Sequence, residues 1–120
     1  MKVLITGGSG FIGTNFIRSF LKKKSNTLIN LDDLTLGQED NPGLSSEEKE
    51  RYSFYKGSIG DKILISKLLN ELKPESIINF AAESHVDRSI LDPLSFANRN
   101  IIETINFLDC LKNYYLNLNE

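Results

Sequence analysis

Short apolar runs alternate along this chain with longer stretches in which apolar residues recur every three or four positions. The short runs are rich in β-branched or aromatic residues and predict four strands, from Lys2 to Thr6, Thr27 to Leu31, Ser53 to Lys56 and Ser76 to Phe80. The longer stretches predict helices from Phe11 to Lys24, from a cap at Asp61 through Asn70 and from a cap at Asp92 onward, and a short surface helix between Leu44 and Arg51. In the last helix the expected apolar stripe consists of Leu94, Ala97, Ile101, Ile105, Leu108 and Leu111.

The alternation of strands and helices predicts an α/β fold with a Rossmann-like parallel sheet. Right-handed crossovers place the strands in the order 3-2-1-4, so that the fourth strand returns beside the first. The loops after these two strands then diverge around the point where ligands bind in open α/β sheets. One loop is rich in glycine, and the other is FAAESHVDRS at 80–89.

Length and composition favour one small intracellular protein. The 120 residues, 40% of them apolar, suffice for one domain spanning residues 1–120. The net charge of −2 argues against a nucleic-acid partner, and a single cysteine, Cys110, excludes an intrachain disulfide and zinc sites built from several thiolates. No apolar stretch is long enough to span a membrane. We therefore expect a cytoplasmic protein with no membrane partner and no metal site.

The first loop, TGGSGFIG at 6–13, has the spacing of a dinucleotide-binding turn. Gly8-x-Gly10-x-x-Gly13 and Gly7-x-x-Gly10-x-x-Gly13 both occur between the first strand and the first helix. Glycines let the backbone approach a diphosphate, and the helix N-terminus offers unpaired N–H groups. A purely structural turn is the alternative, but the strand–turn–helix context favours dinucleotide binding.

Asp32 closes the second strand, 19 residues after Gly13. This separation is typical of the carboxylate that accepts hydrogen bonds from the adenosine ribose, and its charge would repel a 2′-phosphate. We therefore expect NAD as the cofactor rather than NADP. The alternative is that Asp32 only makes a local turn, and Asp33 beside it is expected to be solvated.

We interpret the second loop as one side of a binding site rather than as a source of catalytic residues. Small Ala81 and Ala82 would let the backbone approach a cofactor, and Ser84 supplies a hydroxyl. For Glu83, Asp87 and Arg88 we favour a hydrogen-bonded scaffold. His85 is the only histidine, and without a nucleophile or metal partners it is more often structural. Tyr52 and Lys56 spell Tyr-x-x-x-Lys, but on a strand they are about 13 Å apart instead of about 6 Å on one helical face.

These motifs carry a family resemblance. TGGSGFIG, Asp32 with Leu34 and Thr35, the stretch from Ser58 to Asp61, and above all AAESHVDRSI at 81–90 resemble the extended short-chain dehydrogenase/reductase superfamily, specifically its dTDP-glucose 4,6-dehydratases. The resemblance runs in register from Met1 to about Tyr115. It implies a bound NAD that oxidises the hexose C4, loss of water across C5 and C6, and return of the hydride to C6. It also implies a homodimer and a nucleotide-sugar substrate, dTDP-glucose.

The resemblance also assigns binding roles. It places Gly7, Gly10, Phe11, Ile12 and Gly13 at the pyrophosphate, Asp32, Asp33, Leu34 and Thr35 at the adenosine ribose, Ser58 and Ile59 at the adenine, and Phe80, Ala81, Ala82, Glu83 and Ser84 at the nicotinamide ribose. Ser84 would also contact the nucleotide sugar.

The chain departs from the family pattern in three respects. Ser58 stands where the family usually has Asp, and Arg99 where a small residue is usual. The family's catalytic Thr, Asp, Glu and Tyr-x-x-x-Lys groups would lie on a fifth strand and the helix after it, beyond these 120 residues. We therefore expect no catalytic residue here, a sheet that is incomplete relative to the family, and self-association through the edge of the fourth strand. A non-catalytic NAD or nucleotide-binding module and a fragment of a nucleotide-sugar epimerase are the alternatives.

Overall fold

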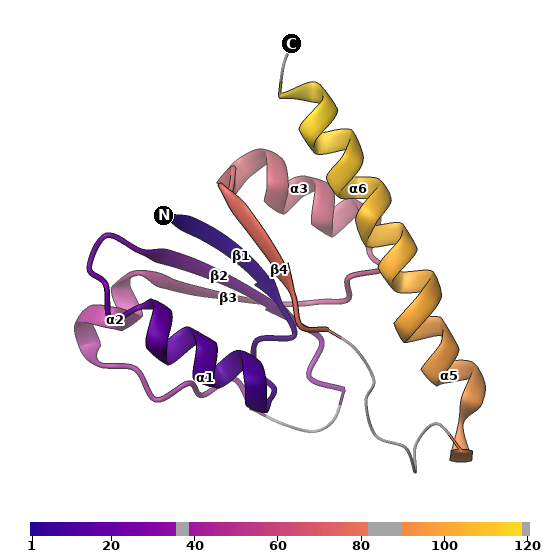
Figure 1. The fold of residues 1–120 in the computed structure, drawn as a ribbon, viewed down its shortest axis with the longest axis horizontal. Coiled ribbons are helices and arrows are strands. Elements are labelled where there is room, and N and C mark those ends of the chain that lie inside the picture. Colours follow the sequence, from indigo (N-terminus) through magenta and orange to yellow (C-terminus); the bar gives the residue numbers. More distant parts are fainter. Residues whose placement is uncertain (36–38, 82–89, 119–120) are drawn as a thin grey trace. The chain divides into compact units, whose positions relative to one another are not determined.

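The computed structural model describes residues 1–35, 39–81 and 90–118 of the chain (Figure 1). The chain divides into two compact units. The first unit contains residues 1–57 and 74–81, and the second contains residues 58–73 and 82–120.

The first unit is built on a parallel sheet of four strands, β1 (Lys2–Thr6), β2 (Thr27–Asp32), β3 (Tyr52–Lys56) and β4 (Ser76–Asn79). Their order is β3-β2-β1-β4, as the sequence predicted. Leu4 of β1 pairs with Ile29 of β2 on one side and with Ile77 of β4 on the other. Because all neighbours are parallel, the carboxyl ends of the strands meet at one edge of the sheet (Figure 1).

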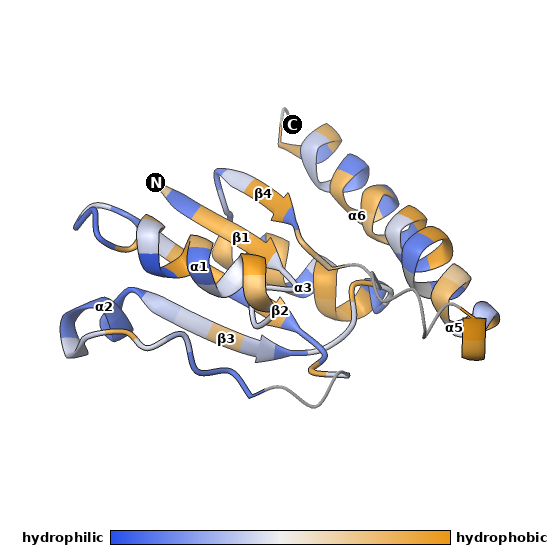
Figure 2. Ribbon diagram, turned by 60° about the horizontal axis from the view of Figure 1, so that its bottom comes forward, coloured by the Kyte–Doolittle hydropathy of each residue, from blue (hydrophilic) through white to orange (hydrophobic). Residues whose placement is uncertain are grey.

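The core of this unit lies between the sheet and α1 (Phe11–Phe20) (Figure 1). Val3 and Ile5 of β1 and Leu28 of β2 pack with Ile17 and Leu21 from the helix side. These apolar residues recur every second position in β1 and every fourth in the helical segment, so each element presents one face to the other. Figure 2 shows β1 hydrophobic over most of its length and β3 paler, in agreement with the partial exposure of β3.

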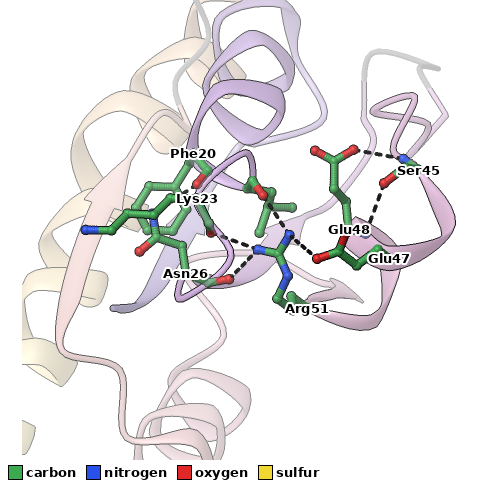
Figure 3. Close-up of polar contacts among 8 residues, drawn as sticks. Phe20, Lys23, Asn26, Ser45, Glu47, Glu48 and Arg51 are labelled. Carbon is green, nitrogen blue, oxygen red and sulfur yellow. Dashed lines mark hydrogen bonds and ion pairs between the residues drawn. The ribbon is translucent and has the colours of Figure 1, made fainter.

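Helix α1 ends at Phe20, four residues earlier than the periodicity predicted, and Arg51 shows the physical reason. The Arg51 guanidinium donates hydrogen bonds to the backbone oxygens of Leu21 at 2.7 Å, Lys23 at 3.0 Å and Asn26 at 2.9 Å (Figure 3). These bonds satisfy carbonyl groups between α1 and β2 that a longer helix would have paired internally. The tertiary contact therefore overrides the helical propensity of Lys22 to Lys24.

A short helix, α2 (Ser46–Glu50), precedes β3 and confirms the expected surface helix. Ser45 caps it by accepting a hydrogen bond from the Glu48 N–H at 3.2 Å, and the Glu48 carboxylate accepts one from the Ser45 N–H at 2.9 Å (Figure 3). This reciprocal pair is a capping box, which explains why the helix starts where it does.

The second unit is helical. It contains α3 (Lys62–Leu72), α5 (Pro93–Ala97), the π-helical turn η1 (Asn98–Ile102) and α6 (Glu103–Asn117). Asp61 and Asp92 cap α3 and α5 through their side chains, as the sequence predicted. Helices α3 and α6 lie side by side (Figure 1) and are joined at their surface by Lys62 and Asp109, with Nζ and Oδ2 3.1 Å apart.

The buried face of α6 differs from the predicted stripe. Phe107, Cys110 and Tyr114 are buried, whereas Leu94, Ile101, Ile105 and Leu108 are exposed in this chain. Apolar residues occur on both faces of this segment, so their spacing alone did not determine which face is covered. Within the described residues, no helix is long and apolar enough to cross a membrane.

Candidate nucleotide-binding site

The glycine loop leads directly into the N-terminus of α1. Gly10 is the N-cap residue, and the N–H groups of Phe11, Ile12 and Gly13 have no acceptor among residues 1–35, 39–81 and 90–118. Phe11 and Ile12 are 86% and 68% exposed. An α-helix leaves these first N–H groups unpaired and carries partial positive charge at this end, so the turn is suited to bind an anion.

Backbone contact brings the segment that begins at Phe80 against this loop. Gly7 has φ of +69°, and a Cβ at this residue would lie 2.6 Å from the Ala81 nitrogen. The Asn79 side chain accepts hydrogen bonds from the Thr6 hydroxyl and from the Ala81 N–H, the latter at 3.0 Å. Phe80 and Ala81 therefore lie beside the glycine loop, as the predicted strand order requires.

Gly10 differs from Gly7 because the protein itself does not require a glycine there. Its φ of −75° is accessible to any residue, and the nearest atom to an added Cβ would be the Gly7 oxygen at 3.6 Å. The space beside Gly10 is therefore not filled by the described chain. Such a surface fits the close approach of a diphosphate.

Asp32 closes β2 beneath the glycine loop and is only 7% exposed. Its Oδ2 accepts a hydrogen bond from the Ser9 N–H at 3.0 Å, and its Oδ1 accepts one from the Leu34 N–H at 2.9 Å. A carboxylate offers about four acceptor sites in all, and these two bonds leave further sites unused. The carboxylate thus orients the loop and can still receive hydroxyl groups from a ligand.

The turn after Asp32 is held by its own side chains. Asp33 Oδ1 accepts hydrogen bonds from the Thr35 N–H at 3.1 Å and the Thr35 hydroxyl at 3.0 Å. Leu34 has φ of +57°, a left-handed conformation that costs a non-glycine residue about 1–2 kcal/mol. The local hydrogen bonds of Asp32 and Asp33 offset this cost. Asp33 is therefore part of the turn as well as partly solvated.

Polar residues that the sequence analysis did not select underlie this site. Asn30, Asp40 and Tyr52 form hydrogen bonds with one another, and Asn30 and Asp40 also bond to the Ser9 hydroxyl. Asn30 is fully buried. Its position as a polar residue inside the apolar run TLINL was the one sign in the sequence that its side chain has hydrogen-bond partners in the fold. Tyr52 lies on β3, as does Lys56, so this pair does not share a helical face.

Ser58 and Ile59 belong to the second unit. The Ser58 hydroxyl donates to Glu103 Oε1 at 2.9 Å and accepts a hydrogen bond from the Gly60 N–H at 3.0 Å, while Ile59 is buried. Glu103 is the first residue after the π-helical turn η1. Turns of this kind often occur at functional sites. The structure therefore places a carboxylate next to the serine, which spacing along the chain did not suggest. The expectations for Ala82, Glu83, Ser84, His85, Asp87 and Arg88 concern residues outside those that the structure describes.

Comparisons with known proteins identify the family of this chain. Residues 4–119 match the GDP-mannose 4,6 dehydratase family model. The chain is 42% identical over 112 residues to the dTDP-glucose 4,6-dehydratase of Xanthomonas campestris pv. campestris strain B100, covering 93% of this chain and 32% of that protein.

Two solved structures share the fold. The dTDP-glucose 4,6-dehydratase of Streptomyces venezuelae with NAD and TYD bound is 34% identical, with a TM-score of 0.82 over 95% of this chain and 36% of that chain. The UDP-glucose 4-epimerase of Thermotoga maritima with UDP-glucose is 28% identical, with a TM-score of 0.80 over 95% of this chain and 35% of that one. The chain thus spans about a third of the length of the proteins it matches, and it belongs to the GDP-mannose 4,6 dehydratase family.

Proposed function

We propose that this chain is the NAD-binding part of a dTDP-glucose 4,6-dehydratase. The observation that carries the proposal is the turn at Gly10, where the N–H groups of Phe11, Ile12 and Gly13 have no acceptor among the described residues and the Cβ position of Gly10 meets no described atom closer than 3.6 Å. These donors and the N-terminus of α1 would hold the diphosphate of the dinucleotide. Gly7, with its positive φ, would allow the backbone to form the same turn.

Asp32 would bind the adenosine ribose through the acceptor positions that Ser9 and Leu34 leave free. A 2′-phosphate at this ribose would meet the buried charge of Asp32, so NAD is preferred over NADP. Asp33, Leu34 and Thr35 would line the same side, in the turn that their hydrogen bonds stabilise.

Ser58 and Ile59 would contact the adenine. Ser58 carries no charge, but its hydroxyl donates to Glu103. The carboxylate therefore strengthens the oxygen of Ser58 as an acceptor for an amino group. Phe80 and Ala81, with Ala82, Glu83 and Ser84, would form the wall beside the nicotinamide ribose, and Ser84 would also contact the nucleotide sugar.

NAD supplies a hydride acceptor and donor, which suits oxidation at the hexose C4 followed by reduction at C6. We assign no acid or base for these steps to the present residues, and we expect the 120-residue chain alone not to convert dTDP-glucose. Homology favours a dehydratase over an epimerase, since the identities to the dehydratases named above exceed that to the epimerase.

A homodimer is also part of this proposal. In the described sheet β4 pairs with β1 alone, so its other edge offers unpaired backbone donors and acceptors. We expect the isolated chain to self-associate through this edge. Light scattering that shows a monodisperse monomer at high concentration would contradict this part of the proposal.

Calorimetry with NAD tests the cofactor assignment. We expect the unmodified chain to bind NAD and the Gly10→Ala variant to bind it about tenfold more weakly, because the added methyl group occupies the surface that the diphosphate approaches. The same variant should unfold within about 1 kcal/mol of the unmodified chain, since its backbone conformation suits alanine. Absence of NAD binding by the folded chain, or equal binding by both proteins, would refute the proposal.

A further inference from the structure

A buried polar network connects the glycine loop to two strands and to the segment after Asp32. Its centre on β2 is Asn30, whose side-chain Oδ1 accepts a hydrogen bond from the Gly8 N–H at 2.9 Å. Its Nδ2 donates to the Ser9 hydroxyl oxygen and the Tyr52 hydroxyl oxygen, each at 3.1 Å. A buried amide that lost these partners would cost free energy, so Asn30 and the glycine loop restrict each other's position.

A second centre is Asp40, which lies between β2 and α2. Its Oδ1 accepts hydrogen bonds from the Tyr52 hydroxyl at 2.6 Å, the Ser9 hydroxyl at 2.9 Å and the Asn30 side-chain amide at 3.3 Å. Three donors from the glycine loop, β2 and β3 therefore converge on one carboxylate oxygen. Bonds to an ionised acceptor are about twice as strong as neutral ones.

Tyr52 acts as a donor in this network at neutral pH. Burial raises the pKa of its hydroxyl, and the hydrogen bond to Asp40 raises this pKa further. The phenol therefore stays protonated and directs its proton to Asp40. Tyr52 thus fixes Asp40, and Asp40 in turn holds the hydroxyl of Ser9.

We propose that Asp40 and Tyr52 are positioning residues for dinucleotide binding, which hold the turn from Gly7 to Gly10 through Ser9. This inference rests on the proposed function, since it concerns the same loop. Neither residue is assigned a contact with the cofactor. Their effect is on the loop: the N–H groups of Gly8 and Ser9 are anchored to Asn30 and Asp32, and that of Gly10 bonds to the Gly7 oxygen. The N–H groups of Phe11, Ile12 and Gly13 then remain directed to the ligand. A preorganised loop avoids the entropy cost of ordering on binding.

A purely structural network makes a different prediction. It would lower the stability of the whole sheet when broken, and it would weaken every ligand of the site equally. A positioning network acts on the glycine loop, so it affects ligands that carry a diphosphate more than those that lack one. These two expectations separate the roles experimentally.

The test compares Tyr52→Phe with Tyr55→Phe in the 120-residue chain. Both changes remove one phenolic hydroxyl from β3, but Tyr55 makes no side-chain hydrogen bond with any described residue. In Tyr52→Phe we expect the N–H groups of Gly8 and Ser9 to exchange with solvent about fivefold faster, because the lost bond to Asp40 acts on these N–H groups only indirectly, through Ser9 and Asn30. The N–H groups of β1 should exchange at unchanged rates, and Tyr55→Phe should alter neither set.

Binding supplies the second measurement. For Tyr52→Phe we expect the dissociation constants of NAD and of ADP to rise about fivefold, while that of adenosine, which has no phosphate, stays unchanged. Equal weakening of all three ligands, or unchanged exchange at Gly8 and Ser9, would overturn the inference. If the unmodified chain does not bind NAD, the proposed function is wrong and the positioning role falls with it. Normal NAD binding by Tyr52→Phe would refute the positioning role alone.

Discussion

The Asp32 carboxylate accepts a hydrogen bond from the backbone N–H of Ser9, with Oδ2 and N 3.0 Å apart. One buried side chain thereby connects the end of β2 to the glycine loop that precedes α1. The diphosphate turn and the adenosine side of the proposed site are therefore mechanically coupled. A substitution at Asp32 should therefore affect both the diphosphate turn and the adenosine side.

Replacing Asp32 with alanine should weaken NAD binding about tenfold and reduce the preference for NAD over NADP. The variant would lose the proposed ribose acceptor and the charge that would oppose a 2′-phosphate. Charge-assisted hydrogen bonds contribute about 1.5–3 kcal/mol each. Calorimetry with both cofactors measures the two effects. Asp109→Asn is the control for the loss of one negative charge and should leave both affinities unchanged, because Asp109 pairs with Lys62 at the surface and is assigned no contact with the cofactor. Equal affinity of the unmodified chain for NAD and NADP would show that Asp32 is not the ribose ligand.

Replacing Gly7 with alanine should destabilise the first unit by about 2–4 kcal/mol. The residue has φ of +69°, and its Cβ would overlap with the backbone of Ala81. Chemical denaturation measures the change in the free energy of unfolding. Gly10→Ala is the comparison, since its Cβ meets no atom closer than 3.6 Å. Similar losses in both variants would mean that Phe80 and Ala81 do not lie against the glycine loop.

Arg51→Ala should cost about 2–4 kcal/mol of stability, because three backbone oxygens lose their donor. Arg51→Lys should recover only part of it, since one ammonium group cannot replace two guanidinium nitrogens that reach three carbonyls (Figure 3). Glu47→Gln is the control: Glu47 Oε1 lies 3.9 Å from Arg51 and its side chain is 58% exposed, so the change should stay within about 0.5 kcal/mol. If Arg51→Lys kept the full stability of the unmodified chain, the two guanidinium nitrogens of Arg51 would not be required.

The Glu48 carboxyl should titrate at a lower pH in the folded chain than in urea. The hydrogen bond from the Ser45 N–H, followed by that involving the Ser45 hydroxyl, holds the pKa of Glu48 below its ordinary value of 4.5. A lowered folded-state pKa means that the contribution to stability is present above the unfolded-state pKa and is lost as the pH falls through the folded-state pKa. Carboxyl chemical shifts recorded in both states measure this. A higher pKa in the folded chain would contradict the capping box.

The strand order and the place of the glycine loop could be predicted because they depend on local patterns. Apolar periodicity marks which residues can be covered, and the handedness of parallel crossovers leaves few arrangements for these elements. The N-caps Asp61 and Asp92 were predictable for the same reason, since each cap bonds within its own first turn. The end of α1 could not be predicted in this way, because it depends on Arg51, which is far away in the sequence.

By itself, the sequence determined the parallel α/β sheet, the glycine-rich turn at Gly10 and the position of Asp32 after β2. Tertiary structure alone decided that Ser9, Asn30, Asp40 and Tyr52 share one network, that Glu103 supports Ser58 and that Phe107 faces inward on α6. The physical reason is the range of the interactions. Backbone conformation and apolar spacing act between near neighbours, whereas hydrogen bonds across 21 or 45 residues form only once folding has brought the elements together.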